Sequence, residues 1–138
     1  MIDGADQPPA PNAPPQLAKI SIAQLSPTLE QSQEKCFEAT VTLVWPYSSS
    51  TKSLSLLLAE PDFRLRRLHG QVKVIFHGRV AEQVAASHVG IGDNICLALK
   101  DSHFVANDTA AQTPGRCVAW DVHFDYGLSL EVILTFNT

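Results

Sequence analysis

Apolar side chains at every second position constrain this chain more than any other feature of its sequence. Two such runs, residues 37–45 and 52–59, flank a short polar segment. Successive side chains of a β-strand point to opposite faces, so this period predicts two strands, each with one buried face. The residues expected on the buried faces are Phe37, Ala39, Val41, Leu43, Trp45, Leu54, Leu56 and Leu58. The polar segment between Trp45 and Lys52 predicts the turn of a β-hairpin.

The rest of the chain continues the pattern. We expect a short strand or turn over 19–29, and strands over 71–77, 95–99 (with an extension towards 104–105), 116–124 and 128–136. A short helix is expected over 80–87, between the third and fourth long strands. The order strand, strand, strand, helix, strand, strand is that of the OB-fold, a five-stranded Greek-key barrel. The sequence therefore predicts an all-β fold with one short helix, an OB-fold barrel with an additional C-terminal strand.

Composition sets the domain organisation. The chain has 138 residues, which suits one domain. Residues 1–18 are rich in proline and poor in apolar residues, which predicts a disordered tail before an OB-fold domain over 19–138. The three cysteines are widely spaced and form no CxxC pair, so we expect no metal and no cofactor, and a reducing compartment. No apolar run approaches transmembrane length, so a membrane is not an expected partner.

Positive charge is concentrated in the middle of an acidic chain. The formal net charge is −4, yet residues 52–79 hold six basic residues against two acidic ones. In an OB-fold, this region supplies the second and third strands, whose face and adjacent loops bind oligonucleotides. Flat rings that stack on bases, combined with cations that contact phosphates, are typical of single-strand binders. The candidate binding residues are Trp45, Tyr47, Lys52, Ser53, Ser55, Arg64, Arg66, Lys73, His77, Arg79 and Arg116.

The two aromatic candidates of the hairpin differ in their expected placement. Tyr47 follows Pro46 in the turn and is the stronger stacking candidate. Trp45 is in phase with the buried face of its strand, so a core position competes with a stacking role.

Several segments resemble one known family. They are Ile22–Pro27 (IAQLSP), Val41–Lys52 (VTLVWPYSSSTK), Leu56–Asp62 (LLLAEPD) and Ile91–Leu99 (IGDNICLAL). Over residues 25–124 the chain is similar to the telomeric single-stranded-DNA-binding OB-fold proteins, the protection-of-telomeres and telomere end-binding alpha family, with most likeness to fungal members. The resemblance implies a nuclear, telomere-associated protein that binds the G-rich single strand.

Two other function classes were weighed. An enzyme is not expected, because no nucleophile-elbow serine or cysteine and no glycine-rich phosphate loop is present. The alternative is an OB-fold that binds proteins of a telomere complex, or a second copy of itself as a homodimer, with little DNA binding of its own. The acidic balance and the apolar last strand, 128–136, favour that alternative, since an exposed strand edge can pair with another chain.

Overall fold

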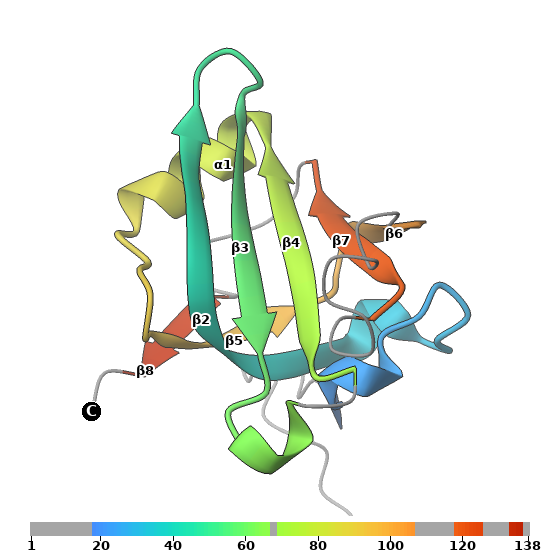
Figure 1. The fold of residues 1–138 in the computed structure, drawn as a ribbon. Coiled ribbons are helices and arrows are strands. Elements are labelled where there is room, and N and C mark those ends of the chain that lie inside the picture. Colours follow the sequence, from blue (N-terminus) through green and yellow to red (C-terminus); the bar gives the residue numbers. More distant parts are fainter. Residues whose placement is uncertain (1–17, 67–68, 107–117, 126–132, 137–138) are drawn as a thin grey trace, which may run out of the picture.

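The computed structural model describes residues 18–66, 69–106, 118–125 and 133–136, and these residues form one strongly curled sheet with a single α-helix. The strands are β1 (Ala18–Lys19), β2 (Lys35–Ser48), β3 (Ser53–Ala59), β4 (Gln71–His77), β5 (Asn94–Ala98), β6 (Ser102–Ala106), β7 (Trp120–Phe124) and β8 (Ile133–Phe136). The helices are α1 (Gly78–Ala86) and the 3-10 turns η2 (Ile22–Gln24), η3 (Ser32–Glu34) and η4 (Phe63–Leu65). Figure 1 shows β2, β3 and β4 side by side, with the other strands curling away from them.

The sheet curls into a half-barrel of the OB-fold type. Its strand order is β6-β7-β4-β3-β2-β5-β8, and β1 pairs with the start of β2. The first part of β2 pairs with β5 and the rest with β3, so this long strand turns the corner of the barrel. Residues 99–101 join β5 to β6, which pairs with β7, and β7 lies parallel to β4. The OB-fold prediction and the additional C-terminal strand, seen here as β8, are confirmed.

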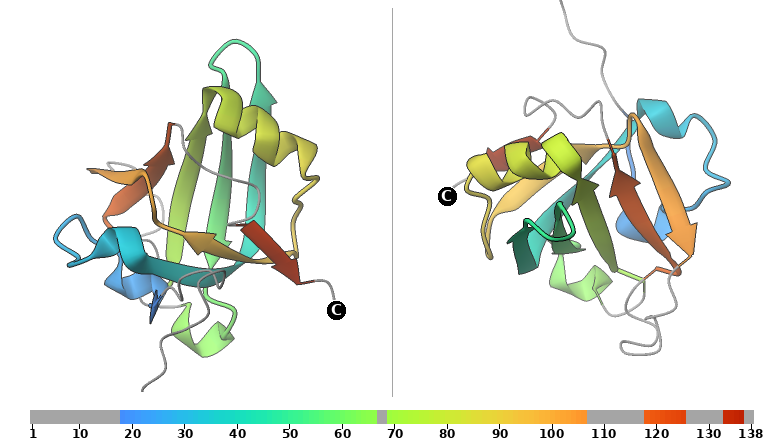
Figure 2. Two further views of the ribbon diagram at one scale, coloured as in Figure 1. Left: turned by 180° about the vertical axis from the view of Figure 1, so that it is seen from behind. Right: turned by 90° about the horizontal axis from the view of Figure 1, so that it is seen from above.

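The core lies inside the curled sheet and confirms the predicted inward face of β3, which carries Leu54, Leu56 and Leu58. Phe37, Phe76 and Phe124 are fully buried, and the rings of the last two stack with their centroids 5.4 Å apart. Helix α1 contributes Val80, Ala81 and Val84 to the same cluster. The two opposite views show the helix on one side of β2, β3 and β4 (Figures 1 and 2), so the other side of these strands is free of helix.

One predicted face is wrong in its second half. Phe37, Ala39 and Val41 are buried as expected, but Leu43 and Trp45 are 47 % and 42 % exposed. The cause is a β-bulge: Val41 pairs with Leu58 but Leu43 pairs with Leu57, so one additional residue enters β2. A bulge shifts the alternation by one position, which turns the following side chains to the opposite face.

Element boundaries differ from the prediction in three places. The strand expected over 95–105 is divided by a turn at Lys100 and Asp101, where Asp101 has a positive φ of 64°. The strand expected from residue 116 begins at Trp120, and the expected helix begins at Gly78, just after β4 ends. Residues 1–17 of the tail predicted over 1–18 lie outside the described residues, whereas Ala18 belongs to β1. Residues 107–117 and the first part of the predicted last strand also lie outside them.

Candidate nucleic-acid interface

The helix-free face of the sheet carries a row of side chains from five neighbouring strands. Directly paired residues of adjacent strands project from the same face. Trp45 on β2 pairs with Ser55 on β3, which pairs with Ile75 on β4. The row continues through His123 on β7 to His103 on β6. Ser55 and Ile75 are almost covered, at 9 % exposed each, so they form the floor between Trp45 at one end and the histidines at the other.

Trp45 and Lys73 form a cation–aromatic pair on this face. The Lys73 ammonium lies 4.6 Å from the centroid of the Trp45 ring. Lys73 also acts on Asp121: burial raises the pKa of that carboxyl, and the charge of Lys73 lowers it. An exposed ring held beside a half-buried cation offers one surface for a nucleic-acid base and one charge for its phosphate.

Three histidines stack beside this pair. The rings of His77 and His123 have centroids 5.0 Å apart and an angle of 9° between their planes, and those of His103 and His123 are 5.3 Å apart at 20°. His77 Nε2 and His123 Nδ1 share a hydrogen bond of 2.8 Å. We call these three residues the histidine ladder. It is built from β4, β6 and β7, and it lies at the carboxyl end of β4.

One carboxylate is shared by the outer members of the histidine ladder. Asp125 places its oxygens 3.8 Å from His77 Nε2 and 3.5 Å from His103 Nδ1. The central ring differs: burial, and then the charges of His77 and His103, hold the pKa of His123 below its ordinary value, while Asp125 raises it. The neutral imidazole of His123 is therefore the favoured form in the folded protein.

The hairpin end of the face holds several predicted candidates. Lys52 is exposed with a φ of 54°, and its carbonyl accepts a 2.7 Å hydrogen bond from Gly78 N–H. Ser53 pairs with His77, and Arg79 is exposed in the first turn of α1. Tyr47 is partly buried and packs against the core, whereas Trp45 is turned outward. The structure thus exchanges the expected placements of the two rings. The bulge between Val41 and Leu43 turns Trp45 outward, and a second register shift, between Trp45 and Ser48, separates Tyr47 from that face.

The arginines of the β3–β4 connection lie at the opposite end of these strands. The Arg64 guanidinium binds the carboxylate of Asp62 at 3.1 Å. Arg66 donates to the carbonyl of Glu60 and lies over the ring of Phe63, 4.1 Å from its centroid. The positive charge of residues 52–79 is therefore divided between the two ends of the strands. Arg64 and Arg66 do not lie beside Trp45 and the residues paired in line with it. Arg116 lies outside the described residues.

Sequence reasoning missed His103 and His123. Both lie at outward positions of strands in which apolar and polar residues alternate. That alternation is the only signal in the sequence that could have predicted an outward position for them. Their meeting with His77 depends on the parallel pairing of β4 with β7, which joins residues far apart in the chain.

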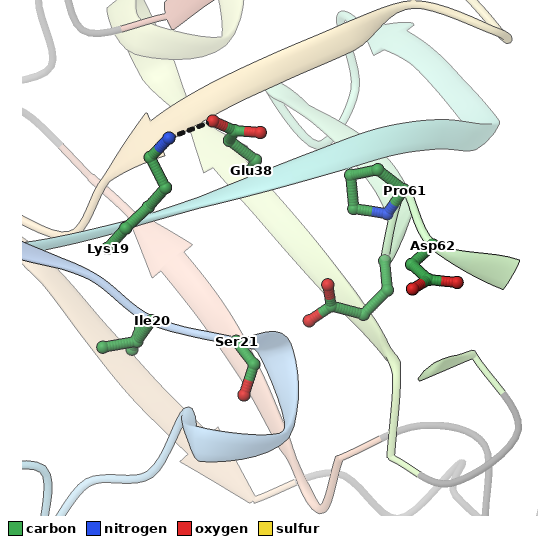
Figure 3. Close-up of a pocket in the computed structure, with 7 residues that line it drawn as sticks. Lys19, Ile20, Ser21, Glu38, Pro61 and Asp62 are labelled. Atoms are coloured by element: carbon green, nitrogen blue, oxygen red, sulfur yellow. Dashed lines mark hydrogen bonds and ion pairs between the residues drawn. The ribbon is translucent and has the colours of Figure 1, made fainter. Parts of the chain in front are cut away.

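A separate pocket of about 390 Å³ is acidic and does not suit a phosphate backbone. Figure 3 shows its lining, which consists of Lys19, Ile20, Ser21, Glu38, Glu60, Pro61 and Asp62. Lys19 pairs with Glu38, and the buried carboxylate of Glu60 accepts a 2.6 Å hydrogen bond from the Ile22 N–H. The remaining negative charge repels phosphates, so this pocket is not part of the candidate interface.

Other kinds of site were searched in the same residues. Among those that the structure describes, no group of three or more His, Cys, Asp or Glu side chains is arranged to hold a metal ion. Burial and the neighbouring Cys36 raise the pKa of the Cys96 thiol to about 11, so this thiol is protonated at neutral pH and is a poor nucleophile. Within the described part of the chain, no helix is both long and apolar enough to span a membrane.

Comparison with known families covers almost the whole chain. The model of a domain of unknown function, DUF8502, matches residues 16–137. The chain belongs to the DUF8502 family. No curated protein sequence matches this DUF8502 chain.

Solved structures supply the fold relationship of the DUF8502 chain. Schizosaccharomyces pombe Pot1pC bound to ssDNA (CGGTTACGGT) matches with a TM-score of 0.55 and 14 % identity, over 88 % of each chain. A structure of fission yeast Pot1 and ssDNA matches with a TM-score of 0.54 and 14 % identity, over 88 % of this chain and 40 % of that one. At this identity the likeness establishes a shared OB-fold.

Proposed function

We propose that this chain binds single-stranded DNA across the helix-free face of β2, β3, β4 and β7, without catalysing a reaction. The observation that carries the proposal is the Trp45–Lys73 pair. Lys73 lies on β4, the third long strand, whose face OB-folds use for oligonucleotides, and Trp45 lies on β2, near the β2–β3 turn that also belongs to that surface. Trp45 is exposed beside the half-buried Lys73, and the nearby ends of β3 and β4 add Lys52, His77 and Arg79. The likeness in fold to two DNA-bound Pot1 structures supports the same reading.

The mechanism is stacking combined with charge neutralisation. A base stacks on the free surface of the Trp45 ring, a contact worth about 1–3 kcal/mol in single-strand binders. Lys73, held over the other surface of the ring, then lies close to the phosphate of the stacked nucleotide. Lysine replaces condensed counterions on the strand, so affinity falls as salt rises. Ser53 and the histidine ladder supply polar groups for base edges and sugar.

The telomeric assignment is the finer part of this proposal. It is supported by the sequence resemblance over residues 25–124 and by the GG dinucleotides in the strand bound by one neighbour, CGGTTACGGT. We propose that the preferred ligand is a G-rich telomeric single strand and that the protein acts in the nucleus, at chromosome ends. We propose no enzymatic activity, because the Cys96 thiol is protonated at neutral pH and is a poor nucleophile.

Fluorescence anisotropy tests the proposal with three labelled strands: CGGTTACGGT, a scrambled strand of the same composition, and the complement ACCGTAACCG. We expect salt-dependent binding that favours the first strand. The decisive variants are a matched pair of exposed aromatics, Trp45→Ala on the face and Phe63→Ala at the far end of the strands. Loss of stacking should lower the affinity of Trp45→Ala about 5- to 150-fold, and Phe63→Ala should bind like the wild type.

The outcomes separate the parts of the proposal. Equal binding of all three strands would leave a general single-strand binder and remove the telomeric assignment. An absence of binding at low salt, or an equal loss in both variants, would overturn the proposed interface.

A second function, a docking surface for another protein or for a second copy of the chain, is favoured by one observation. Phe63 and Leu65 on η4 are 75 % and 52 % exposed, side by side on one turn at the far end of the sheet from the hairpin. Exposed apolar pairs of this kind mark interaction sites. Sedimentation of the wild type and of a Phe63→Ser/Leu65→Ser variant tests this function. A dimer that only the wild type forms would support it, and a monomer in both cases would remove the homodimer.

A further inference from the structure

We propose that the histidine ladder, His77, His103 and His123, is a phosphate subsite that works only when the ladder carries extra protons. The inference rests on the proposed binding of single-stranded DNA and deepens it. At the carboxyl end of β4, the ladder contacts the phosphate backbone of the bound DNA, and this contact strengthens as the pH falls.

The geometry limits how many protons the ladder can hold by itself. In the 2.8 Å hydrogen bond between His77 Nε2 and His123 Nδ1, one nitrogen donates and the other accepts. If both nitrogens carried protons, two N–H groups would face each other and the contact would open. His123 also stacks on both neighbours, so every charge on an outer ring acts on the central one.

Compensating negative charge is scarce around the ladder. Asp125, at the end of β7, is the carboxylate within 4 Å of the ladder, and it serves two imidazoles, His77 and His103. Lys73 on β4 adds a positive charge that acts on His123. Asp121 on β7 is the other acidic group that the described residues place on this face; the charge of Lys73 acts on it, and its buried Oδ1 accepts no hydrogen bond. Among the residues that the structure describes, three imidazoles and a lysine thus share two carboxylates, and a second proton on the ladder has no counter-charge of its own.

A phosphodiester supplies the missing charge. Its oxygens accept hydrogen bonds from imidazolium N–H groups, and its negative charge offsets the second proton. The ladder lies in the same row as Trp45, separated from it by Ser55 and Ile75, so a strand stacked on Trp45 and running along the row passes over the histidines. The side chains are accessible, with His77, His103 and Asp125 at 36 %, 50 % and 45 % exposed.

Linkage sets the size of the effect. A ligand that binds the protonated ladder more tightly raises its pKa, and each unit of that rise makes binding in acid about tenfold tighter. We expect the affinity for a single strand to rise about three- to tenfold between pH 8 and pH 6.

The experiment measures the affinity for labelled CGGTTACGGT at about pH 8, 7 and 6 and constant ionic strength. The variants are His123→Gln, His103→Gln and His88→Asn. His88 is the matched control: it is exposed after α1 with a φ of 60°, a backbone region that asparagine accepts. His103→Gln, on a half-exposed side chain, keeps the test open if His123→Gln does not fold. We expect the wild type and His88→Asn to gain affinity as the pH falls, and the ladder variants to lose most of that gain.

The experiment separates the failure of the phosphate subsite from the failure of the proposed single-stranded-DNA binding. Binding with the same affinity at every pH, or a gain in the ladder variants as large as in His88→Asn, would overturn the phosphate subsite alone. An absence of binding at every pH would overturn both proposals together.

Discussion

Lys73 offers the most quantitative test of the proposed interface. Its ammonium is held 4.6 Å from the Trp45 ring centroid, and the residue is half-buried. The side chain therefore loses little conformational entropy when it binds a phosphate. Lys73→Gln removes the charge and keeps most of the stem. Loss of the cation–aromatic contact at such a site should lower the free energy of unfolding by only about 0.5–1 kcal/mol, so the variant stays folded.

The expected loss of affinity depends on salt in a calculable way. One phosphate contact on a single strand contributes about 0.7 to the slope of log K against log salt concentration. Relative to about 1 M salt, this contact therefore raises the affinity for DNA about fourfold at 0.15 M salt and about eightfold at 0.05 M salt. Lys73→Gln should bind more weakly by these factors, and its slope should be shallower by about 0.7.

Anisotropy titrations over a range of salt concentrations measure both quantities. Arg64→Gln is the matched control, because Arg64 is 88 % exposed but already neutralised by Asp62 at the far end of the strands. A slope in Lys73→Gln that equals that of the wild type would refute the assignment of a phosphate to Lys73. So would a loss in Arg64→Gln as large as in Lys73→Gln.

Three further predictions concern stability, and urea denaturation measures each. Glu60→Ala should cost about 1.5–3 kcal/mol, because it leaves the buried N–H of Ile22 without its acceptor; a cost below about 0.5 kcal/mol would contradict this. Phe76→Ala should cost about 3–5 kcal/mol as a cavity in the core, whereas Phe63→Ala on the surface should change stability by less than about 0.5 kcal/mol; similar costs would contradict the burial pattern. Because the pKa of His123 is lowered in the fold, the stability that its neutral form contributes is complete above pH 6.5 and declines as the pH falls below that value towards the folded pKa. His123→Gln should flatten this decline in the DNA-free protein, and an equally steep decline in the variant would contradict the assignment.

Much of the fold could be predicted because its strands alternate cleanly. Leu54, Leu56 and Leu58 are inward as their period requires, and so are Val122 and Phe124. Strand β2 is the exception, because its alternation is interrupted by a bulge. Leu43 and Trp45 are apolar and in phase with Val41, so nothing local in the sequence marks the bulge that turns them outward.

The site was predicted only in part, for a related reason. Trp45, Ser55, Lys73 and His77 do share one face, because β3 and β4 pair in continuous antiparallel register and the bulge in β2 turns Trp45 outward. Arg64 and Arg66 are close to Lys73 in the sequence, but the β3–β4 connection carries them to the other end of the sheet. Closeness in the sequence therefore predicted more positive charge near Lys73 than the structure places there.

The sequence by itself determined the class of fold, because alternation and turn residues act over a few neighbours and depend little on the rest of the chain. Only the tertiary structure decided which functional side chains meet. His77, His103 and His123 converge through the parallel pairing of β4 with β7 and the antiparallel pairing of β6 with β7. Such pairings depend on how the whole barrel buries its core, and no local pattern around any one of the three histidines records them.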